Sequence, residues 1–200
     1  MSLLYPGALP ETVCIDGEDY SVRWKFYAIL TILKILDNST PFEGEDLSLE
    51  GRMVLALDFF YRDSIPHNWG GALEAMFEFI RRASWDNGYK GKEADEHVLD
   101  WEIDAPFIWA SMKQAYPFWD WGEAHWWEFK AAFDSLPAAS KIKEVMSIRL
   151  RKFDAGMNSK EREALHELKR AYSLPVRSQS KRRAADIEAE LKAKVGEPHG

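Results

Sequence analysis

Cysteine is nearly absent from this sequence, and so are the segments that direct a chain out of the cell or into a membrane. The one cysteine, Cys14, cannot form an internal disulfide, and no Cys-x-x-Cys pair is present for zinc binding or thiol redox chemistry. No basic residue precedes Arg23, and the longest apolar run, residues 26–33, is far shorter than the ~20 residues that span a bilayer. We therefore expect a soluble protein of a reducing cytoplasm that does not bind membranes.

The common sequence signatures of catalysis are also missing. The chain contains no Gly-x-Ser-x-Gly motif, no Walker-type phosphate loop and no Gly-x-Gly-x-x-Gly fingerprint. These absences exclude the most common designs of hydrolases, NTPases and dinucleotide-dependent enzymes. We expect a non-enzymatic protein with no catalytic, cofactor-binding or metal-binding residues.

The chain does carry a high apolar content and a marked segregation of charge. Hydrophobic residues make up 46% and aromatic residues 14% of the sequence, which argues against intrinsic disorder. Residues 1–137 have a net charge of −13 and residues 138–200 a net charge of +6, and only two of the 27 aromatic residues follow residue 137. We predict a globular helical body over residues 1–157 and a basic helical extension over residues 158–200, whose last part is loosely attached or ordered only on a partner.

Hydrophobic spacing predicts a mainly α-helical fold of about six helices after a short N-terminal β-hairpin, with one or two tail helices at the C-terminus. The hairpin covers residues 12–23 around the turn-forming pair Asp16-Gly17. Helices are expected over about 22–36, 49–61, 69–80, 104–116, 121–136, 141–153 and 159–172, with a thinner apolar stripe over 184–191. Residues 84–98 are polar and aperiodic, so we expect a long surface loop there.

Helix starts are predicted from residues whose side chains accept hydrogen bonds from the first turn. The expected caps are Ser21, Asn68, Asp104 (or Asp100), Asp120 with Glu123, Ser140, and Asn158 with Glu161. We expect Phe153 to face inward on the sixth helix, and Leu165, Leu168 and Tyr172 to face inward on the seventh.

Three groups of residues invite a chemical interpretation. His97 with Asp100, Glu102 and Asp104 suggests acid–base chemistry, but carboxylates at i, i+2 and i+4 do not share a helix face, so a charged helix start is favoured. Glu163 and His166 have the spacing of di-iron bundles, which need two such motifs, and only one is present. We expect His125 to be a packed imidazole.

Two further features suggest binding to a partner. Trp119 and Trp121 flank Asp120 ahead of a predicted helix, where little scaffold covers them, and exposed tryptophan marks partner surfaces. We expect the other tryptophans, Trp109 among them, to be mostly core. Lys181, Arg182 and Arg183 form a basic run that lacks nearby aromatic residues, so we expect no nucleic-acid binding there.

The segment from Leu99 to Arg149 resembles the "gene product fifteen" family of long-tailed bacteriophages. Weaker similarity extends to the hairpin, the first helix and the helix after residue 160. Ala124 departs from the leucine usual in the family, and residues 117–121 replace a shorter link. The segments that carry the resemblance are Asp100-Trp101-Glu102, Asp104-Ala105, Ile108-Trp109-Ala110, Tyr116, His125-Trp126-Trp127, Phe129, Leu136-Pro137 and Ile148-Arg149.

The resemblance implies a tail assembly chaperone of the host cell cytoplasm. Such a chaperone binds the tape measure protein and assists polymerisation of the tail tube protein in virion assembly. Self-association of the chaperone is compatible with this role. Trp119, Trp121 and the basic residues Lys181, Arg182 and Arg183 are then the candidate contacts. A structural tail component stays open as an alternative, as does an enzyme that uses residues 84–104.

Overall fold

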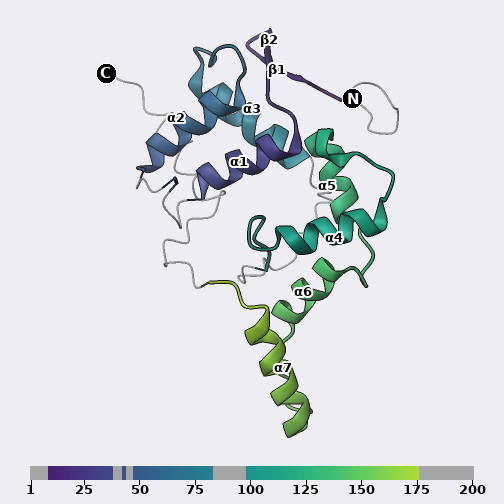
Figure 1. Ribbon diagram of the computed structural model, residues 1–200. Helices are drawn as coiled ribbons and strands as arrows, with labels where there is room; N and C mark the ends of the chain where they lie inside the picture. The colour runs from purple at the N-terminus through teal and green to yellow at the C-terminus, as the bar shows by residue number, and fades with distance from the viewer. Residues whose placement is uncertain (1–8, 38–41, 44–46, 83–97, 176–200) are drawn as a thin grey trace. The chain divides into compact units, whose positions relative to one another are not determined.

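The computed structural model describes residues 9–37, 42–43, 47–82 and 98–175 (Figure 1). Seven α-helices and one two-stranded hairpin occur in these residues, which confirms the predicted mainly helical fold. The described residues form two compact units, one of residues 9–82 and 121–130 and the other of residues 98–120 and 131–175. The predicted division at residue 157 into a body and an extension stays a prediction.

The hairpin is formed by β1 (Thr12–Ile15) and β2 (Glu18–Ser21), which pair antiparallel with Ile15 opposite Glu18. Asp16 and Gly17 have φ values of 52° and 87°. A two-residue turn of this hand matches the twist of the strands it joins, and glycine adopts it without steric cost. The Asp16-Gly17 turn predicted from sequence is therefore confirmed.

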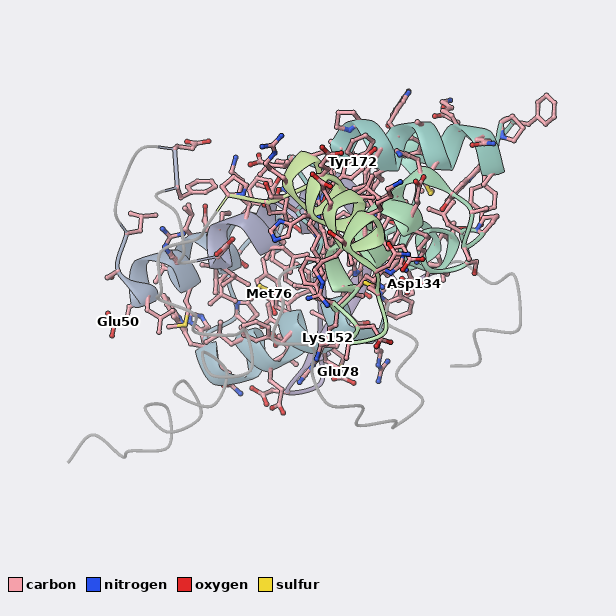
Figure 2. All side chains as sticks on the ribbon, turned by 90° about the horizontal axis from the view of Figure 1, so that it is seen from below. Glu50, Met76, Glu78, Asp134, Lys152 and Tyr172 are labelled. Carbon is pink, nitrogen blue, oxygen red and sulfur yellow. The ribbon has the colours of Figure 1, made fainter. Side chains whose placement is uncertain are left out.

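The first unit packs three helices beside this hairpin: α1 (Phe26–Leu36), α2 (Leu49–Phe60) and α3 (Trp69–Arg82). Helix α1 packs on α2, α2 on α3, and β1 on α3 (Figure 1). On α3, Met76 is fully buried whereas Glu78, two residues later, is exposed (Figure 2). The fully buried apolar side chains recur at helical spacing: Ile29, Ile32, Ile35, Leu57, Phe60 and Met76.

The predicted start of the first helix at Ser21 is wrong. Ser21 lies in β2, and α1 begins at Phe26 with Lys25 as an extended N-cap residue. The backbone before α1 is used in pairing with the end of α2, because Arg62 N donates to Ser21 O at 3.1 Å and Arg23 N donates to Phe60 O at 2.8 Å. Long-range backbone hydrogen bonds thus hold residues 21–23 in extended conformation.

Two arginines stabilise helix ends in the first unit. The Arg23 guanidinium donates to Tyr61 O at 3.1 Å, just after α2. Arg52 is almost completely buried and donates to Ile35 O at 3.0 Å and to Asp37 O at 2.8 Å, at the end of α1. Both place a cation at the negative end of a helix, where it satisfies carbonyls that have no partner within the helix.

Two predicted caps are confirmed by their hydrogen bonds. Gly71 N donates to Asn68 Oδ1 at 2.9 Å at the start of α3. In α7 (Ser159–Ala171), Asn158 and Glu161 form the reciprocal pair of a capping box, with both hydrogen bonds at 3.0 Å. Helix α2 also follows its predicted range.

The second unit contains α4 (Ala105–Ala115), α6 (Lys141–Leu150) and α7, with α6 packed on both of the others. Ser140 precedes α6 as predicted, but its side chain does not cap the helix, and its buried Oγ has no partner in the part of the chain described. Ser111 of α4 supplies the acceptor instead, since Ile142 N donates to its Oγ at 3.1 Å. The cap is therefore a tertiary contact between α4 and α6.

The expected inward positions at the end of α6 and on α7 are partly wrong. Helix α6 ends at Leu150, so Phe153 lies beyond it and is exposed. On α7, Leu165 is buried but Leu168 is 41% exposed. Tyr172 is half-buried at the C-cap, where it contacts Phe107 with ring centroids 5.9 Å apart. Leu165 is the one buried side chain of α7, and most of this helix is exposed.

Candidate functional site

Trp121 is buried, which corrects the expectation that it is exposed. It lies on a 3-10 turn, η1 (Trp121–Glu123), and is 6% exposed. Its ring packs against Phe26 and Phe129, with centroids 5.7 Å and 5.9 Å apart, and those two phenyl rings stack on each other at 4.3 Å. Trp121 is a core residue of the first unit, so we do not assign it to a partner surface.

The predicted capping box of Asp120 and Glu123 does not start the fifth helix. Helix α5 (Trp126–Asp134) begins after η1, and His125 is the residue that caps it. The backbone N–H of Trp127 donates to His125 Nδ1 at 3.1 Å, so Nε2 carries the proton and donates to Pro10 O at 3.0 Å. A histidine cap has no common sequence signature, whereas Asp followed by Glu at the right spacing does.

His125 is also packed among aromatic rings, which confirms the packed imidazole predicted from the sequence. Its ring stacks on Trp24 with centroids 5.5 Å apart and meets Trp127 edge-on at 5.4 Å. Burial lowers the pKa of His125 below the ordinary value, because the charged imidazolium is poorly solvated there. The imidazole is therefore a structural element of the helix start, with both nitrogens engaged.

The two tryptophans after His125 stabilise the C-terminal end of α3. Trp126 Nε1 donates to Ile80 O at 3.1 Å, and Trp127 Nε1 donates to Phe79 O at 2.8 Å. These carbonyls belong to the last turn of α3, where no backbone N–H further along the helix is available to donate to them. The His-Trp-Trp segment that carries much of the family resemblance thus joins the start of one helix to the end of another.

Two of the carboxylates that suggested acid–base chemistry, Asp100 and Asp104, accept hydrogen bonds that hold the second unit together. Asp104 is fully buried, and both of its oxygens accept from Arg149, at 2.6 Å and 2.8 Å. Asp100 accepts from Glu102 N and Ile103 N, both at 3.0 Å, in the turn before α4. Asp104 occupies the predicted N-cap position, but its carboxylate pairs with arginine instead of capping. His97 lies outside the described residues.

Glu163 and His166 are both exposed on α7, and His166 packs against Phe153 with ring centroids 5.1 Å apart. Across residues 9–37, 42–43, 47–82 and 98–175, no three His, Cys, Asp or Glu side chains are grouped to hold a metal ion. Nor is any helix in these ranges long and apolar enough to cross a bilayer.

The most exposed large apolar side chains of the second unit lie just before α4, on it and just after it. Ile103 is 48% exposed, Trp109 55% and Phe118 100%. We call these three residues the α4 patch. Trp109 was expected to be mostly core; it lies instead on the solvent side of α4, with the Lys113 ammonium 5.3 Å from its ring centroid. Such exposed aromatic residues are typical of partner surfaces.

Trp119, predicted to contact a partner, is half-buried and meets Tyr116 edge-on with ring centroids 5.8 Å apart. Part of the Trp119 ring is therefore accessible, and Trp119 directly follows Phe118 of the α4 patch in the sequence. The other predicted contacts lie outside the described residues: Lys181, Arg182 and Arg183. The same holds for residues 84–97 of the predicted surface loop and for the apolar stripe over residues 184–191.

Comparison with known proteins identifies a family for this chain. A family model described as "Bacteriophage Gp15 protein" matches residues 7–174, which include the hairpin and all of the described helices. No curated protein and no solved structure matches the chain.

Proposed function

The chain belongs to the bacteriophage Gp15 protein family, and from this premise we propose that it is a non-enzymatic tail assembly chaperone that binds the tape measure protein. A member of this family is a phage structural or assembly protein. The chaperone role within that class is the proposal. It includes assistance to tail tube polymerisation in the cytoplasm of the host cell.

The physical need for such a chaperone follows from the shape of its client. A tape measure protein is a very long helix whose apolar stripes have no partner until the tail tube closes around it. Exposed apolar surface of that extent leads to aggregation. A chaperone that covers it has to present apolar side chains of its own and release them later, which suits modest affinity per copy and many copies per client.

The α4 patch has the properties that this role requires, and its exposure is the observation on which the proposal rests. Phe118 is fully exposed and Trp109 more than half exposed, so large aromatic side chains are accessible to solvent in the isolated chain. Aromatic residues contribute most of the binding free energy at many interfaces. Trp119 remains a candidate contact, and we propose that the basic residues Lys181, Arg182 and Arg183 steer the chaperone toward acidic client segments.

Co-expression with the cognate tape measure protein tests the proposal. We expect the wild-type chain to raise the soluble fraction of the client and to co-purify with it in multi-copy complexes. The double variant Trp109→Ala with Phe118→Ser should lose most of this effect while it keeps its melting temperature, because both side chains are exposed. Leu168→Ser on α7, which also removes an exposed apolar side chain from the second unit, is the matched control and should behave as wild type.

The outcomes separate the chaperone from its alternatives. A wild-type chain that neither solubilises nor co-purifies with the tape measure protein contradicts the chaperone role. If the chain is found instead at fixed copy number in assembled tails, it is a structural tail component. Equal loss in the Leu168→Ser control would place the client contact outside the α4 patch.

A further inference from the structure

A groove of about 270 Å³ lies between β1 and α3, within the first unit. One wall is the start of the hairpin, with Pro10, Thr12, Val13 and Cys14, and the other wall is α3, with Ala75, Phe79 and the ion pair of Glu78 and Arg82. The Trp127 ring also lines the groove. The groove is therefore open to solvent and is lined by both apolar and polar atoms.

The β1 wall presents backbone hydrogen-bonding groups that β2 does not use. Val22 N donates to Glu11 O at 3.0 Å, so Glu11 forms a hydrogen-bonded pair with Val22, the residue that follows β2. Such pairs alternate along an antiparallel ladder, which directs the N–H and C=O groups of Thr12 and Cys14 away from β2. Both residues are exposed, and within the described residues no backbone group pairs with this edge. The edge can accept a further strand.

The two walls are held together at the turn end of the groove. Asn68, the cap of α3, donates from Nδ2 to Asp16 Oδ2 at 2.9 Å. Gly71 approaches the hairpin so closely that an added Cβ would lie 3.1 Å from the Ile15 side chain. The groove is therefore preformed at this end, which lowers the entropy lost when a ligand binds.

The charge of the hairpin indicates what kind of segment fits. Residues 11–22 contain four acidic residues, Glu11, Asp16, Glu18 and Asp19, and no basic residue. The four β1 residues between Glu11 and Asp16 are uncharged, and Glu78 and Arg82 neutralise each other at 2.6 Å. A strand added beside β1 thus has acidic groups near both of its ends and neutral surface between them.

We propose that this groove binds an extended peptide segment with basic residues at its ends, which adds to the hairpin as a third strand along β1. Main-chain hydrogen bonds to Thr12 and Cys14 supply the common part of the recognition, and small or β-branched side chains of the segment lie over Val13 and Ala75. A second copy of this chain fits less well, because pairing two hairpins would bring their acidic residues together. The inference is independent of the α4 patch, which lies in the other unit.

A labelled peptide tests both the pairing and the charge. The probe is fluorescein-labelled Lys-Thr-Val-Thr-Val-Lys. Its two lysines are five residues apart, about 16 Å in an extended strand, and Glu11 and Asp16 are also five residues apart in the sequence. We expect saturable binding to the full chain by fluorescence anisotropy. The same peptide with glutamates in place of the lysines should bind at least about tenfold more weakly. N-methylation of its edge-facing amides should abolish binding, since it removes the main-chain donors.

Two substitutions at one position provide the protein control. Cys14→Pro removes an N–H that the hairpin itself does not use, so it should weaken binding about tenfold or more and leave the fold intact by circular dichroism. Cys14→Ser keeps the N–H and should bind as wild type. The methylated peptide keeps the proposal testable even if the proline variant unfolds.

Three results would overturn the proposal. The first is the absence of binding by the lysine peptide, and the second is equal binding of the methylated and unmethylated peptides. The third is a wild-type chain that binds no peptide but forms a dimer, if Cys14→Pro dissociates that dimer. This result would assign the β1 edge to a second copy of the chain.

Discussion

Replacing Arg149 by methionine should destabilise the second unit more than any surface change of similar size. Arg149 joins α4, α6 and the end of α7: it pairs with both oxygens of Asp104 and donates to Tyr172 O at 2.7 Å and to Val98 O at 2.9 Å. The Asp104 side chain is 0% exposed and that of Arg149 is 8% exposed. Without the guanidinium, a carboxylate stays buried with the Asp100 N–H as its remaining donor among the described residues.

Removing one partner of a buried ion pair costs about 3–5 kcal/mol, because the remaining charge loses its compensation without gaining water. We expect Arg149→Met and Asp104→Leu each to lower the free energy of unfolding by an amount in that range. The double variant should lose clearly less than the sum of the two, since no unpaired charge remains. Urea titrations followed by circular dichroism measure all three values.

The surface ion pair between Arg82 and Glu78 is the control for this cycle. It is more than half exposed on both sides, so Arg82→Met should change stability by less than about 1 kcal/mol. A loss below about 1 kcal/mol in Arg149→Met, or strict additivity in the double variant, would show that the buried pair does not hold these helices together.

The remaining predictions concern the His-Trp-Trp segment and the tail. Trp126→Ala should cost about 3–5 kcal/mol, because it empties a buried site and removes the hydrogen bond to Ile80 O; a change in a thermal melt equivalent to less than about 1 kcal/mol would place the residue outside the core. Because the pKa of His125 is lowered in the folded chain, the unfolded chain binds a proton first as the pH falls. The free energy of unfolding should therefore be constant above neutral pH, decline below about pH 6.5, and become constant again below the folded-state pKa. His125→Asn, which keeps an acceptor for Trp127 N, should flatten this profile. Ending the chain at residue 175 should leave the melting temperature nearly unchanged, as expected from the narrow apolar stripe of the sequence beyond it, and a cooperative loss of structure would contradict this.

Local features of the sequence determined those parts of the fold that depend on a few adjacent residues. The Asp16-Gly17 turn, the Asn68 cap and the capping box of Asn158 and Glu161 each need a hydrogen bond or a backbone conformation within four residues. The periodicity of apolar residues likewise indicated the helices, because a helix buries one face whatever it packs against. The family resemblance rests on the same kind of local pattern.

The tertiary structure alone decided which of several suitable residues is used, and which aromatic residues are buried. Ser21 and the Asp120–Glu123 pair have the right chemistry for caps, but backbone pairing at the end of α2 and the Trp121 turn place them elsewhere. The sequence predicted an exposed Trp121 and a mostly buried Trp109, yet Trp121 packs against two phenyl rings and Trp109 is 55% exposed. Burial depends on partners that are distant in sequence, such as Phe26 for Trp121, and the spacing of neighbouring residues carries no information about them.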